Sequence, residues 1–173
     1  VRRSQIAHGD ENRAGPGGAL GEGNQIRQVI AAQHREVRGL FRAAKKAKPA
    51  GRREAMKTIA ANLSAHMQIE EDFFYPAVKA LDTKKVLELV PEAYEEHHVV
   101  ALVLQELPSV DPNDERFEAK MTVLEGLIEH HVKEEEQEMF TSAQRLGADR
   151  LAELGTTMKE SFDDVLAGDG RKR

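Results

Sequence analysis

The chain has 173 residues, which is enough for one domain with a hydrophobic core. Its net charge is −5, and 40% of its residues are hydrophobic and 32% charged. The acidic balance gives no basic surface for nucleic acid, no apolar run approaches a membrane span, and no apolar segment follows the N-terminal arginines as in a signal peptide. There is no cysteine, so disulfides and thiolate metal sites are excluded. We therefore expect a cytoplasmic protein without nucleic-acid or membrane partners, in which nitrogen and oxygen atoms would hold any metal.

The chain begins with a segment that lacks hydrophobic periodicity. Residues 1–24 contain the sequences GPGG and GEG and are expected to form a flexible arm. Apolar residues then recur at helical spacing over about 25–46, 52–75, 91–107 and 114–144. Pro76 is expected to end the second helix, and Pro91 to begin the third after a partly helical connector.

The four predicted helices are joined by short connections. Consecutive helices should therefore be antiparallel neighbours, which predicts an all-α, up-down-up-down four-helix bundle over residues 25–146. A further amphipathic helix is expected at about 148–167, within a C-terminal segment of residues 147–173. This additional helix should either cap the outside of the bundle or help a homodimer to form.

Four histidines fall on the apolar faces of the predicted bundle helices: His34, His66, His97 and His131. Two of them are followed four residues later, on the same helical face, by Glu70 and Glu135. The segments HMQIEEDFFYP and HVKEEEQEMFT align, and the separations from His34 to His66 and from His97 to His131 are 32 and 34 residues. An apolar interior tolerates carboxylates and imidazoles when they are paired or bind a metal, so the pattern predicts a shared metal site.

The register of two motifs has alternatives. His98 adjoins His97, and His130 with Glu134 is an alternative to His131 with Glu135. We prefer His97 and His131 because the apolar residues Leu104 and Ile128 share their faces. The other acidic residues near the motifs are expected to form a solvated face: Glu71, Asp72, Glu134, Glu136 and Glu138.

The segments LSAHMQIEEDFFYP, EEHHVV and HHVKEEEQEMF resemble the hemerythrin-like, HHE cation-binding proteins. The resemblance covers about residues 25–144. It implies a four-helix bundle with two non-haem iron ions, bridged by an oxo or hydroxo group, with zinc as the alternative metal. By motif match the metal ligands would be His34, His66, Glu70, His97, His131 and Glu135.

The chain departs from the oxygen-carrying branch of that family one turn after His97. A second histidine stands there in the carriers, and here the position is Ala101. Tyr75 or Tyr94 could supply a further ligand as a phenolate. An iron with an open position suits the turnover of a small molecule, so we expect peroxide breakdown of the catalase type. The alternative is a module that binds or senses oxygen, nitric oxide or iron without being an enzyme.

Overall fold

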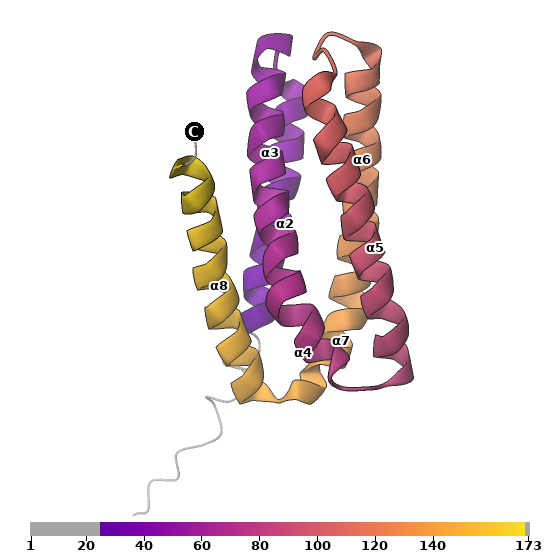
Figure 1. Ribbon diagram of the computed structural model, residues 1–173, viewed down its shortest axis with the longest axis vertical. Helices are drawn as coiled ribbons and strands as arrows, with labels where there is room; N and C mark the ends of the chain where they lie inside the picture. The colour runs from indigo at the N-terminus through magenta and orange to yellow at the C-terminus, as the bar shows by residue number, and fades with distance from the viewer. Residues whose placement is uncertain (1–24, 172–173) are drawn as a thin grey trace, which may run out of the picture.

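Four antiparallel helices form a bundle, and a fifth long helix lies along one side of it (Figure 1). The computed structural model describes residues 25–171, so the predicted arm at 1–24 lies outside the described residues, as do residues 172 and 173. The long helices are α2 (Gln25–Lys46), α3 (Pro49–Ile69), α5 (Lys84–Glu106), α6 (Glu115–Glu134) and α8 (Ala148–Arg171). Residues 25–171 contain no β-strand, which confirms the predicted all-α four-helix bundle with an additional C-terminal helix.

Two short helices extend the bundle at its lower end in Figure 1. They are α4 (Tyr75–Lys79), which continues α3, and α7 (Phe140–Ala143), which continues α6. Each is separated from its long helix by one turn of π-helix, at Glu70–Phe74 and Glu135–Met139. Of the helices described, none combines the length and the apolar character needed to cross a membrane.

A layer of polar side chains divides the interior into two hydrophobic clusters. The lower cluster takes residues from α4, α7 and α8 and includes Ile30, Phe74, Val90, Met139 and Met158. The upper cluster lies at the opposite end of the four helices and includes Val37, Phe41, Leu63, Leu104 and Leu124. On α2 the lower cluster ends at Ile30 and the upper one begins at Val37, with His34 between them. The polar layer therefore interrupts an otherwise apolar core.

Helix α8 packs on the outside of α2 and α3, as expected if this helix caps the outside of the bundle. It buries Leu151, Leu154 and Met158 in the lower cluster. Gly155 allows the closest approach, because a Cβ added there would lie 2.7 Å from the backbone nitrogen of Ile26. A larger residue at this position would push the start of α2 away from α8. The homodimer remains a prediction.

Two prolines do not act as the sequence predicts. Pro91 does not begin a helix: it lies inside α5, which starts earlier, where Val86 N donates to the side chain of Thr83 over 3.4 Å. Pro91 and Leu87, whose carbonyl loses its helical donor to the proline, both lie on the exposed face of α5. Pro76 does not end the second helix either, because α4 runs through it. In a π-helical register the residue at position 76 would donate its N–H to the carbonyl of Glu71, but a proline has no N–H to donate. The Tyr94 hydroxyl donates to that carbonyl instead, over 3.3 Å.

Candidate metal centre

Four buried imidazoles meet in the polar layer, one from each helix of the bundle. They are His34 on α2, His66 on α3, His97 on α5 and His131 on α6, each at most 5% exposed. The Nε2 atoms of His34 and His66 are 3.2 Å apart, as are those of His97 and His131. The side chains that the sequence analysis singled out from four distant segments therefore form two facing pairs.

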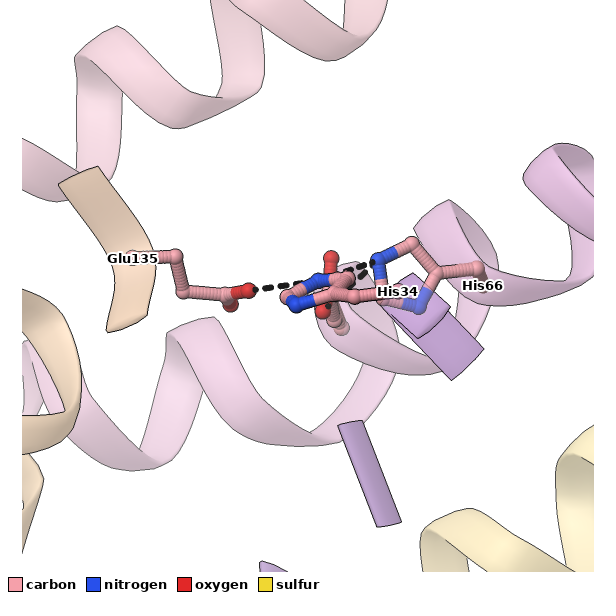
Figure 2. Close-up of side chains that lie close together, drawn as sticks. His34, His66 and Glu135 are labelled. Carbon is pink, nitrogen blue, oxygen red and sulfur yellow. Dashed lines mark hydrogen bonds and ion pairs between the residues drawn. The ribbon is translucent and has the colours of Figure 1, made fainter. Parts of the chain in front are cut away.

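Two fully buried glutamates complete the layer. Glu70 lies between the histidine pairs, with Oε1 3.2 Å from Nε2 of His66 and Oε2 3.4 Å from Nε2 of His97. Glu135 points at the first pair, with Oε2 3.3 Å from Nε2 of His34 (Figure 2). The structure thus brings all six predicted ligands into one cluster, with Glu70 shared by both halves.

Each of these glutamates begins a π turn. In an α-helix, a side chain shares its face with the third and fourth residues after it. A π turn contains one extra residue, so here the fifth residue after each glutamate comes to lie on its face. The N–H of Tyr75 accordingly bonds to the carbonyl of Glu70, and the N–H of Phe140 to that of Glu135. Regular α-helical spacing would put Phe73, three residues after Glu70, on the buried face, whereas the π turn leaves Phe73 half-buried and turns Tyr75 inward.

The two tyrosines proposed as extra ligands are in different places. The hydroxyl of Tyr75 lies within the cluster, 3.1 Å from Nε2 of His97 and 3.3 Å from Oε2 of Glu70. The hydroxyl of Tyr94 instead donates to the backbone of Glu71, outside the cluster. Of the two candidates, Tyr75 is the one that the structure brings to the imidazoles.

An outer ring of acceptors holds the far side of every imidazole. The Nδ1 atom of His34 is 2.9 Å from Glu136, that of His66 is 2.8 Å from Gln33, that of His97 is 2.9 Å from Glu71, and that of His131 is 2.8 Å from Glu96. Because an amide or carboxylate oxygen can only accept, Nδ1 carries a proton in each ring, and each Nε2 points to the centre, where it can bind a metal once it is unprotonated. This is the usual arrangement of metal-binding histidines.

Part of this ring was not predicted from the sequence. Glu71 and Glu136 were expected on a solvated face, whereas each is partly buried and holds a ring nitrogen. Gln33 and Glu96 were not predicted as contacts of the centre, although each stands immediately before a histidine on the apolar face, and that position was the available signal.

The alternative histidines lie outside the centre. His98 is exposed, and the side chain of His130 is 60% exposed. His130 instead forms a surface group with Glu96 and Glu134, whose carboxylate oxygens lie 3.4 and 3.7 Å from its Nε2. The structure turns His131 inward in its place.

The buried carboxylates fit a cation better than they fit an empty core. Oε1 of Glu70 and both oxygens of Glu135 are buried and accept no hydrogen bond, and the approach of His34 to Glu135 does not have hydrogen-bond geometry. Leaving such a group unpaired costs about 1–3 kcal/mol, and more when it is charged. Two sets of ligand atoms each lie within 4.8 Å of one another: His34, His66, Glu70 and Glu135, and Glu70, His97 and His131. Imidazole with carboxylate is a donor set suited to iron, manganese or zinc.

The electrostatics of the centre separate residues that are otherwise alike. Burial and the neighbouring histidines lower the pKa of His66 to about 3, even though Glu70 opposes this. Burial also acts on His131, but hydrogen bonds to Glu70 and Glu96 outweigh it and raise its pKa to about 10. Burial together with the charge of Glu70 raises the pKa of Glu135. Corresponding groups in the two halves therefore have different affinities for protons.

A small cavity of about 10 Å³ adjoins the imidazoles on the side of the upper cluster. Apart from the four histidines, its lining is aliphatic or thioether: Val37, Leu63, Met67, Val100, Ile128 and Val132. A space of this size holds about one water-sized molecule. The cavity is therefore at the lower limit for a single water, and apart from the histidines its lining offers a small molecule no hydrogen bond.

Comparison with known proteins gives one family and two individual relatives. The model of the hemerythrin HHE cation binding domain matches residues 25–143. A crystal structure of a hemerythrin HHE cation-binding domain-containing protein from Mycobacterium kansasii has the same fold, with a TM-score of 0.73 at 24% identity over 84% of this chain and 89% of that one. A protein named DNA nickase, from Nostoc sp., is 25% identical over 146 residues, and the chain spans 40% of its length.

Proposed function

The chain belongs to the hemerythrin HHE cation-binding family, and on that premise we propose that it holds two iron ions in the polar layer. Position A would be formed by His34, His66 and Glu135, and position B by His97 and His131. Glu70 would bridge the two positions with its two oxygens. Zinc is the alternative metal, since the same donors also suit it.

The observation that supports this proposal best is three buried carboxylate oxygens that accept no hydrogen bond: Oε1 of Glu70 and both oxygens of Glu135. They face Nε2 atoms whose direction is fixed by the Nδ1 bonds of the outer ring. Positive ions between them would satisfy both groups at once. Bound iron would supply reversible one-electron exchange, which the side chains of this chain do not provide.

We further propose that the centre acts on hydrogen peroxide, converting two molecules to two of water and one of oxygen. The protein's part is to exclude bulk water and larger reductants, and the small aliphatic cavity does so. The hydroxyl oxygen of Tyr75 lies 3.3 Å from Oε2 of Glu70 and donates its proton to it, within reach of the centre. Position B has no donor from Ala101, so fewer histidines and carboxylates surround it than position A. The Tyr75 hydroxyl lies beside it, 3.1 Å from Nε2 of His97.

Metal analysis and peroxide consumption test this proposal together. We expect two irons per chain after production with iron, and oxygen evolution from peroxide that exceeds the rate of free iron. His66→Ala should lose iron and activity, whereas His98→Ala, which removes an exposed histidine, should keep both. Zinc alone, or no metal, would refute the iron centre. A rate equal to that of free iron and unchanged by His66→Ala would refute peroxide breakdown.

Binding without turnover is the second candidate, because the aliphatic lining beside the imidazoles suits an apolar ligand such as oxygen or nitric oxide. A visible spectrum that changes with either gas, in a protein that does not consume peroxide, would favour it. We do not extend the nickase activity of the Nostoc relative to this chain, which spans 40% of that protein and has a net charge of −5.

A further inference from the structure

The two halves of the bundle repeat each other around the centre. Corresponding histidines are His34 and His97, and His66 and His131, and Glu70 corresponds to Glu135, with each pair 63 or 65 residues apart. The outer contacts repeat as well: the bond from Nδ1 of His34 to the carboxylate after Glu135 matches the bond from Nδ1 of His97 to the carboxylate after Glu70. Any departure from this repeat distinguishes position A from position B.

One departure changes a charge without changing a contact. His66 donates from Nδ1 to the amide oxygen of Gln33 over 2.8 Å, and His131 donates from Nδ1 to a carboxylate oxygen of Glu96 over the same distance. Gln33 is buried and Glu96 is 19% exposed, so bulk water screens neither bond fully. The other oxygen of Glu96 lies 3.4 Å from His130, which helps to hold the carboxylate in place.

The number of inner carboxylates also differs between the two positions, and here position A has the larger number. The ligand atoms around position A include both Glu70 and Glu135, whereas those around position B include Glu70 and no second carboxylate. The additional outer carboxylate thus lies in the half with fewer inner carboxylates. A negative charge that accepts the Nδ1 proton makes the imidazole a better donor at Nε2, and removing such a partner typically weakens metal binding about 10–100-fold.

We propose that Glu96 is a positioning residue that acts through His131 and allows position B to retain its cation despite having one inner carboxylate. Gln33 fills the same place for position A, where two inner carboxylates make a further charge unnecessary. This inference rests on the proposed function, in that it requires two cation positions.

Cobalt(II) titration of the metal-free protein, followed by calorimetry and visible absorption, tests the proposal. We expect the wild type to bind two equivalents. Glu96→Gln, which keeps the shape and the hydrogen bond but removes the charge, should weaken one equivalent by about 10-fold or more and leave the other unchanged. Gln33→Glu should weaken neither. A merely structural role would weaken both equivalents or neither, so a loss confined to one equivalent distinguishes positioning of His131 from a general effect on the fold.

Two further comparisons assign the weakened equivalent. Glu134→Gln alters the surface group with His130 but leaves the Glu96–His131 bond intact, so it should bind two equivalents normally. With position A removed by His66→Ala, the change Glu96→Gln should still weaken the remaining equivalent; with position B removed by His97→Ala, it should have no effect.

The possible failures can be told apart without the alanine variants. Two equivalents in the wild type that Glu96→Gln leaves unchanged, or weakens equally, would overturn the role of Glu96 alone. Fewer than two equivalents in the wild type would overturn the proposed function, and this inference with it.

Discussion

Replacing Glu135 by methionine should stabilise the metal-free protein. Methionine has a similar length and is a good helix former, and it removes two buried oxygens that accept no hydrogen bond. The relief of one unpaired buried group is about 2 kcal/mol. For a domain of this size that is a rise in melting temperature of roughly 4–8 °C. The measurement is a thermal melt of chelator-treated protein followed by circular dichroism.

The order of stability should reverse when metal is added. Wild-type protein gains stability from binding, by about 4 kcal/mol at a metal concentration one thousand times the dissociation constant, whereas Glu135→Met loses a ligand of position A and gains less. Glu95→Met is the matched control, since Glu95 is exposed on α5, and it should shift neither melt by more than about 0.5 kcal/mol. A metal-free Glu135→Met protein less stable than the wild type would show that the unpaired oxygens of Glu135 do not destabilise the metal-free fold.

Three further predictions concern other parts of the molecule. Gly155→Ala places a Cβ 2.7 Å from a backbone nitrogen of α2, so overpacking of about 1–3 kcal/mol should exceed the helix-propensity gain of about 1 kcal/mol and lower the melting temperature. Asp114 caps α6, and hydrogen bonds from the side chain and the N–H of Arg116 lower its pKa to about 2. Its contribution to stability is therefore present above a pH of about 4 and is lost as the pH falls toward 2. The difference in melting temperature between the wild type and Asp114→Ala should shrink over that range. Iron-loaded Tyr75→Phe should lack any visible phenolate absorption band that the wild type shows, whereas Tyr94→Phe should retain it.

The sequence was sufficient to predict the bundle and the cluster of six inner residues. His66 and Glu70 lie on one helical face among plainly apolar neighbours such as Leu63, so periodicity alone turns them inward. His131 could be preferred to His130 because Ile128 shares its face. These inferences depend on regular α-helical geometry, and they hold as far as the geometry stays regular.

The π turns mark where such reasoning ends. A single extra residue in a turn has no reliable sequence signal, yet it rotates everything after Glu70 relative to everything before it. For this reason the inward position of Tyr75 could not be distinguished from that of Phe73. The outer ring was missed for a related cause: Gln33 and Glu96 contact imidazoles on neighbouring helices, and the periodicity of one helix does not show how its neighbours are rotated.

The layer between the two apolar clusters has a consequence for cooperativity. The two clusters share no buried residue. Without ions, the upper and lower ends are therefore joined mainly by the helix backbones and by the paired imidazoles. We expect amide hydrogen exchange in the metal-free chain to show two opening units, one at each end, and the loaded chain to open as a single unit. A few bonds at the midpoint would then govern whether the ends of the molecule unfold separately or together.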